Sequence, residues 1–229
     1  MAKLIGPIGS KMRGKVGQIV AAKTVGGDTA IRSYQPQVKN PKTQRQMAAR
    51  NRFSVVSYVA SKLAGVLEIG FAAASGAAKM YPRNMAVRDW YHLDAAIVND
   101  GSDVQTIDWT SLPVSSQSGI TVAPTGTYTE GTKKVTFTNT TDVELAADET
   151  LGVVVLVVTD EMDTIAVLKA SAATGVTIPD AIVNSGLPFN VLAFYKAIKS
   201  SGTNIPAEQW PWKYPSRTGA SAFIWRQQA

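Results

Sequence analysis

The chain has 229 residues, of which 45 % are hydrophobic and 17 % charged, enough apolar material for a sizeable core and too much for global disorder. It contains no cysteine, which excludes disulfides, thiolate zinc sites and cysteine nucleophiles. The net charge of +6 is unevenly distributed: residues 1–67 carry twelve Lys and Arg and one acid, whereas residues 89–181 carry three Lys and fourteen Asp and Glu. This asymmetry predicts a basic arm that meets a polyanion or an acidic protein surface.

Neither export nor membrane insertion is indicated by the sequence. Residues 1–7 lack the apolar region of a secretory signal. The longest apolar run, residues 151–158, is far shorter than the roughly 20 residues of a membrane-spanning helix. We therefore expect synthesis in a cytoplasm, without a signal peptide and without a membrane partner.

The first 38 residues form a basic segment that is punctuated by glycine. Six glycines between positions 6 and 27 disfavour a helix. Two strand-like runs, residues 16–24 and 29–34, flank Gly26-Gly27-Asp28, a sequence typical of a hairpin turn. Because a lone hairpin is marginally stable in water, we expect this basic arm to pack against something else.

Residues 39–100 are predicted to form a segment of two helices. Asn40-Pro41 ends the extended arm, and Thr43 stands three residues before Gln46, the spacing of a capping box. One helix is expected within residues 39–73 and a second over residues 84–98, joined by a small and flexible connection at residues 72–78. The apolar stripe of the first helix consists of Met47, Val55, Tyr58, Val59, Leu63, Val66, Leu67 and Phe71.

The region from residue 101 to residue 229 is rich in short strand-like runs separated by turn residues. Residues 134–138 alternate between polar and apolar side chains, as in a sheet with one wet face, whereas residues 153–158 are apolar throughout and predict a central strand covered on both faces. This pattern of short strands and turns is typical of an antiparallel sandwich of the immunoglobulin-like type. The complete prediction is an α+β chain with a basic hairpin arm, two helices and a C-terminal β-sandwich. Its expected strands are residues 104–109, 119–122, 134–140, 152–159, 164–170, 176–178, 190–195 and 220–226.

No catalytic or metal-binding pattern stands out. Residues 9–15 resemble a phosphate-binding loop, but Val16 occupies the position where that motif needs Ser or Thr. His92, the only histidine, lies one helical turn from Asp89, yet a metal site would need further ligands, and we expect a half-buried helix residue instead. The acidic turns at residues 99–103 and 160–163 do not have the spacing of a calcium-binding loop. We therefore predict no enzyme, no cofactor, no metal and no small-molecule substrate.

The basic residues of the arm and first helix have two interpretations. They neutralise phosphates of a nucleic acid without sequence preference, or they lie across the acidic sandwich of a neighbouring copy. Aromatic residues for base stacking are scarce in this region, which favours the second interpretation. The candidate partner-binding or nucleic-acid-binding residues are Lys11, Arg13, Lys15, Arg32, Lys39, Lys42, Arg45, Arg50 and Arg52.

Aromatic residues gather near the end of the chain. Two prolines hold the segment 210–215 extended, and its aromatic side chains offer a large amphipathic contact area of the kind enriched at interfaces. A loop that covers the core of the sandwich is an equal alternative. The candidate interface aromatics are Trp210, Trp212, Tyr214 and Trp225.

Three short motifs of the arm and first helix resemble a known family. They are Gly14-Lys15-Val16-Gly17, Ile31-Arg32-Ser33 and Lys39-Asn40-Pro41-Lys42-Thr43, the last followed by Gln46, Arg50 and Phe53. This pattern resembles a family of uncharacterised proteins that is widespread in Bacteroidetes genomes and their phages. The resemblance covers roughly residues 12–75 and implies a non-enzymatic protein that is a component of a virion, with no catalytic residues to carry over.

These observations give a first hypothesis and two alternatives. We expect a structural assembly protein of a bacteriophage virion, made in the host cytoplasm, whose partners are copies of itself, other virion proteins and, non-specifically, packaged nucleic acid. The second hypothesis is a nucleic-acid-binding architectural protein. The third is a surface adhesin or carbohydrate-binding module, against which the missing export signal counts.

Overall fold

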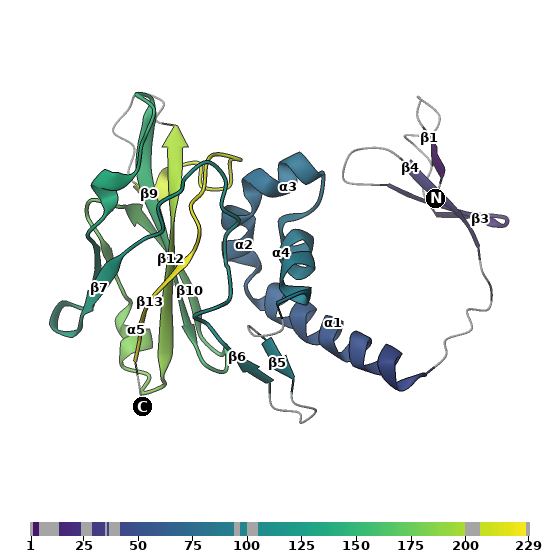
Figure 1. The fold of residues 1–229 in the computed structure, drawn as a ribbon, viewed down its shortest axis with the longest axis horizontal. Helices are drawn as coiled ribbons and strands as arrows, with labels where there is room; N and C mark the ends of the chain where they lie inside the picture. The colour runs from purple at the N-terminus through teal and green to yellow at the C-terminus, as the bar shows by residue number, and fades with distance from the viewer. Residues whose placement is uncertain are drawn as a thin grey trace.

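The computed structural model describes residues 2–4, 14–23, 29–34, 36, 42–93, 97–99, 105–199 and 207–227. Figure 1 shows a body of sheets and helices and, beyond the far end of one long helix, a small separate sheet near the N-terminus. We call the first the body and the second the arm sheet. The described part of the chain is an α+β protein with antiparallel sheets, as the sequence predicted.

The arm sheet has four antiparallel strands in the order β1-β4-β3-β2. The hairpin expected from the Gly-Gly-Asp turn is confirmed, because Lys23 pairs with Thr29 at its end and Ile19 pairs with Ser33 at its base. Two further short strands extend this hairpin on either side. The bounds are Ala2–Leu4 for β1, Gly14–Val16 for β2, Ile19–Lys23 for β3 and Thr29–Ser33 for β4.

The helical region begins where the sequence predicted. The backbone N–H of Gln46 donates to Thr43 Oγ1 at 3.4 Å, so Thr43 caps the first helix. The expectation of one helix up to residue 73 was wrong, because the chain breaks at buried Leu63 and the two helices on either side meet at 83°. The bend brings apolar residues on both sides of the break into the same core. The helices are α1 at Gln44–Lys62, α2 at Ala64–Gly70, α3 at Ala72–Ala78 and α4 at Pro82–Tyr91.

Two further helix predictions need correction. Residues 72–78, expected to be a flexible connection, form α3, because their alanines favour a helix and buried Phe71 anchors its start. The helix expected over residues 84–98 starts at Pro82, a favoured first residue, and ends at Tyr91 rather than at residue 98. Residues 97–99 instead form strand β5, Ile97–Asn99, which pairs with β6, Gln105–Ile107.

The centre of the body is a long antiparallel sheet with the order β10-β9-β12-β13. Residues 153–158 lie in its central strand β9 and are buried throughout, which confirms the prediction for this run. The expected strand at 119–122 is not formed, since Ser118 and Gly119 make only isolated bridges to Thr218. The bounds are Glu149–Thr159 for β9, Ile165–Ser171 for β10, Phe189–Lys199 for β12 and Ala222–Arg226 for β13.

The long sheet separates two hydrophobic clusters, so the body has three layers. On one face, Leu156 and Phe194 share a cluster with Val59 and Trp90 of the helices (Figure 1). On the other face, residues such as Val155 share a second cluster with a three-stranded sheet of order β11-β8-β7 and with the short helix α5. The bounds are Gly126–Thr129 for β7, Lys134–Phe137 for β8, Val176–Thr177 for β11 and Asp180–Val183 for α5.

The first turns of α1 extend away from the body, on the side of the molecule where the arm sheet lies (Figure 1). Residues 44–51 are all exposed, and Phe53 exposes 56 % of its surface. The predicted apolar stripe is therefore buried only from Val55 onward, and its members Met47 and Tyr58 are exposed. Within the described residues, no single helix is long and apolar enough to cross a membrane, and α1 and α2 pass that test by length and composition only as a bent pair.

Candidate partner-binding surface

Two of the predicted basic residues lie in one row of the arm sheet. Lys15 on β2 pairs with Val20, which in turn pairs with Arg32 on β4, so the three side chains share a face. The Nζ of Lys15 lies 3.5 Å from the ring centroid of Tyr34, an arrangement that favours a cation–π interaction. Lys15, Arg32 and Tyr34 are all exposed and form what we call the basic face of the arm sheet.

The opposite face of the arm sheet carries apolar residues beside polar ones such as Ser33. Ile19, Ala21 and Ile31 occupy the alternate positions of β3 and β4 and therefore point away from the basic face. Ile19 is exposed, and of the arm side chains that the structure describes, only Ala21 and Thr29 are buried. Such a sheet buries little surface by itself, which suits a segment that acquires its full stability from a partner.

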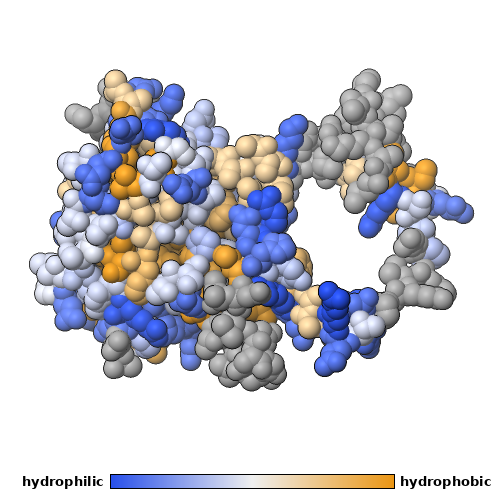
Figure 2. All heavy atoms as spheres, in the orientation of Figure 1, coloured by the Kyte–Doolittle hydropathy of each residue, from blue (hydrophilic) through white to orange (hydrophobic). Residues whose placement is uncertain are grey.

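Of the remaining predicted basic residues, some are exposed to solvent and one packs against the body. Lys42, Arg45 and Arg50 are exposed at the start of α1 and along its first turns, where Figure 2 shows mainly hydrophilic residues. Arg52 is half-buried, and its guanidinium lies 5.4 Å from the ring centroid of Tyr91 on α4. Arg52 therefore helps to join α1 to α4. Lys11, Arg13 and Lys39 lie outside the described residues.

Much of the negative charge of the body is paired with cations of the body itself. Asp160 contacts Arg226 at 2.7 Å, and Asp180 contacts Lys133 at the same distance. Further ion pairs join Asp148 to Lys199, Glu149 to Arg217 and Glu68 to Lys213. Within the described ranges, the exposed carboxylates that form no ion pair include Glu130, Asp142, Glu144, Glu161 and Asp163. The acidic region thus offers a partner less charge than its composition suggests.

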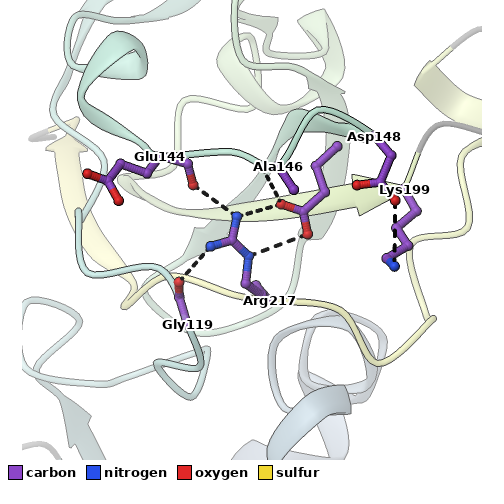
Figure 3. A network of polar contacts seen from close by, with 7 residues as sticks. Gly119, Glu144, Ala146, Asp148, Lys199 and Arg217 are labelled. Atoms are coloured by element: carbon purple, nitrogen blue, oxygen red, sulfur yellow. Dashed lines mark hydrogen bonds and ion pairs between the residues drawn. The ribbon is translucent and has the colours of Figure 1, made fainter.

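The pair of Glu149 and Arg217 is the centre of a polar network (Figure 3). The guanidinium contacts both carboxylate oxygens, at 2.5 and 3.4 Å, and also donates to the carbonyl oxygens of Gly119 and Glu144 at 3.2 and 2.9 Å. The hydrogen bond from Arg217 holds the pKa of the Glu149 carboxyl below its usual value. This network ties three loops to the start of β9. No local pattern in the sequence indicates this network, because the two partners are 68 positions apart.

The candidate interface aromatics are used mainly inside the molecule. Trp212 is only 3 % exposed, stacks on Trp210 with ring centroids 5.5 Å apart, and donates from Nε1 to the carbonyl of Ala207 at 2.8 Å. Trp225 on β13 is partly buried and lies 4.4 Å, centroid to centroid, from Tyr128. Tyr214 exposes 60 % of its surface and is the member of the four that is most available to a partner.

Lys196 is a buried charge that sequence reasoning missed. It lies on the central strand β12 and is fully buried, and its Nζ is 3.5 Å from the carbonyl oxygen of Ile69 in the last turn of α2. Burial lowers the pKa of this lysine to about 8. A lysine among the apolar residues 189–198 was the available signal. The contact with Ile69 places it between the sheet and a helix end, where the helix dipole favours a cation.

The structure provides no metal centre in the ranges that it describes. There, no three side chains of His, Asp or Glu lie close enough together to hold an ion. The carboxylate of Asp89 contacts Arg88 at 2.9 Å, and His92 packs edge to face on Tyr91. His92 is exposed at the end of α4, not half-buried as expected.

These features define an α+β protein with a detached basic sheet and a three-layered body. The chain belongs to a family of unknown function, DUF6266, whose model matches residues 11–200. No curated protein and no solved structure matches the chain. The resemblance to an uncharacterised family is therefore confirmed, whereas its association with Bacteroidetes and their phages stays a prediction.

Proposed function

We propose that this protein is a non-enzymatic structural protein that assembles with copies of itself through its basic arm. The observation that carries the proposal is the arm sheet, which stands apart from the body in Figure 1 and presents Lys15 and Arg32 to solvent. A sheet with so little buried surface gains stability when a second surface covers it. The exposed carboxylates of a neighbouring body supply a surface of opposite charge.

The particle in which this assembly takes place is, in our proposal, a bacteriophage virion, as part of the capsid, connector or tail. The charge-sorted chain, the lack of cysteine and the family resemblance support this class. We also propose that the two packed sheets of the body are of immunoglobulin-like type, which is supported by four antiparallel strands facing three. Mass spectrometry of purified particles from an infected host tests the location directly, and particles that lack the protein would refute it.

The assembly proposal is tested by charge reversal on the arm. The double variant Lys15→Glu and Arg32→Glu changes two exposed residues of the basic face, and Arg83→Glu makes the same kind of change at an exposed site on α4. Native mass spectrometry and light scattering at low and high salt then report the oligomeric state. We expect oligomers of the wild type and of Arg83→Glu that weaken with salt, and a monomeric double variant. A wild-type protein that stays monomeric at high concentration and low salt refutes the proposal.

Nucleic-acid binding is the second candidate function, favoured by the grouping of Lys15, Arg32 and Tyr34 on one exposed face. It predicts an affinity for DNA that falls steeply with salt and is lost in the same double variant. An electrophoretic mobility assay at low salt tests whether the wild-type protein and the double variant bind DNA. If no shift occurs with the wild type, this alternative is rejected.

A further inference from the structure

A groove of about 770 Å³ opens along one side of the body. Residues 167–171 of the edge strand β10 line it, together with residues 174–177, Ala207 and Trp210. Among the described strands, β10 and β11 lie at the ends of their sheets' strand orders. The groove therefore follows a side on which both sheets of the sandwich end.

The backbone of β10 points polar groups toward this side. Thr164 accepts a hydrogen bond from the backbone of Thr159, and Ala172 donates one to Leu151, both at 3.1 Å, so these even-numbered positions face β9. In an antiparallel ladder the direction alternates from residue to residue. The N–H and C=O groups of Val167 and Lys169 consequently point away from β9, toward the free edge, whereas the outward carbonyl of Ser171 already accepts a hydrogen bond from the backbone of Thr174 at 3.2 Å.

The edge at β10 carries little of the usual protection against strand addition, with Lys169 as its one charged residue. Its seven residues, Ile165–Ser171, contain one charge and no proline. The opposite edge strand β13 is shorter, pairs with β12 through an irregular register and lies against β7. A long, nearly uncharged edge with unpaired backbone groups is a template for another strand.

We propose that the groove along β10 receives edge strand β2 from the arm sheet of a second copy. This inference rests on the proposed function and names its docking site. Among the described strands, β2 has β3 as its one neighbour, so its other edge is open to pairing. In Figure 1 the arm sheet lies well away from its own body, which favours a second copy as the acceptor.

Charge complementarity supports the same occupant. Glu161 and Asp163 lie in the turn just before β10, and both are exposed. Lys15, in the middle of β2, is exposed on the basic face of the arm sheet. The groove itself is lined by one charged residue, Lys169, and the two carboxylates lie beyond its lining, before the start of β10. Strand addition with Lys15 opposite the start of β10 would thus bring this cation toward the carboxylates and away from Lys169, while the backbone of β2 satisfies the outward groups of β10.

Lys169→Pro tests the docking site, with Lys169→Ala as its matched control. Proline removes an N–H that faces the open edge, a position at which an edge strand tolerates it, whereas alanine removes only the side chain. We expect Lys169→Pro to weaken self-association about tenfold or more and Lys169→Ala to change it by less than about threefold. Sedimentation equilibrium gives the association constants, and circular dichroism shows that both variants keep the fold.

Hydrogen–deuterium exchange of the wild type gives a second test that does not depend on a variant. We expect amides within residues 165–171 to become protected as the concentration rises through the association range. Protection that is independent of concentration would assign the groove to the arm of the same chain and overturn the proposal. Unchanged association of Lys169→Pro, alongside loss of association in the arm double variant, would also overturn it while leaving the proposed function standing. A monomeric wild type would instead remove the proposed function itself.

Discussion

The body and the arm sheet both contain antiparallel sheets but gain their stability differently. The body buries its apolar residues on both faces of the long sheet and pairs many of its charges internally. The arm sheet leaves Ile19 and Tyr34 exposed and presents Lys15 and Arg32 to solvent. The comparison teaches that the charge of this chain has two uses. Acids and bases of the body hold its loops together, whereas bases of the arm remain available to a partner.

The sharpest test of the tightly packed body is Gly152→Ala on β9. A methyl group at this position would come within 2.6 Å of the ring of buried Trp212. We expect this overpacking to lower the free energy of unfolding by about 2 to 3 kcal/mol, measured by urea denaturation. Gly131→Ala, where an added methyl group meets nothing within 4 Å, is the control. Equal stability of the two variants would contradict the packing of Trp212 on the sheet.

The next prediction concerns the buried charge of Lys196. Its pKa in the folded state is about 8, below the value of about 10.4 for an unfolded chain, so the unfolded state binds more protons between these values. The free energy of unfolding should therefore rise by about 2 kcal/mol from pH 7 to pH 9.5 on account of this residue. Lys196→Met should remove that increment, whereas Lys199→Met, at an exposed lysine, should retain it. Parallel pH profiles for Lys196→Met and the wild type would disprove the burial.

A smaller effect is expected from the polar network around Arg217. Glu149→Gln should lower the free energy of unfolding by about 1.5 kcal/mol at pH 7, because a charge-assisted hydrogen bond is lost. The folded pKa of Glu149 is lowered, so its contribution is present above the unfolded value of about 4.3 and disappears as the pH falls through the folded value. Denaturation of both proteins at pH 7 and at strongly acidic pH measures the difference. Glu144→Gln should have almost no effect, since it is the backbone carbonyl of Glu144 that Arg217 contacts.

The arm double variant Lys15→Glu and Arg32→Glu should have the smallest effect on the body. We expect the thermal unfolding midpoint of the body to stay within a few degrees, because exposed charges contribute about 0.5 kcal/mol or less. Its effect on self-association should be large. A calorimetric scan that shows the body destabilised by this variant would mean that arm and body form one cooperative unit, and the comparison would fail.

Local sequence signals placed several elements correctly. The Gly-Gly-Asp turn predicted the hairpin of β3 and β4, Thr43 marked the start of α1, and the unbroken apolar run around Val155 marked a central strand. Each of these signals acts within a few residues of the chain. The break at Leu63 carries only a weak local signal, Gly65 two positions later, because alanine, valine and leucine recur on both sides of it. Packing on the sheet, not local preference, turns the chain there.

The candidate site was predicted less completely than the fold. The sequence identified Lys15, Arg32 and the basic start of α1, which the structure leaves exposed. It did not show that Arg52 lies over Tyr91 or that Trp212 is buried. The sequence also did not predict that β10 is an edge strand. A strand at the end of a sheet and a strand in its middle differ by their neighbours and not by their own residues.

The sequence by itself determined the class of this protein: an α+β chain with a basic arm, a capped helix and a buried central strand. It did so because charge, helix capping and apolar runs are properties of short stretches. Only the tertiary structure decided which charges remain for a partner. The pairing of Glu149 with Arg217, the burial of Lys196 and the open edge of β10 all depend on residues far apart in the chain. In the folded protein, part of the opposed charge is paired inside the body, and the exposed bases of the arm and the exposed carboxylates of the body that form no ion pair remain for a partner.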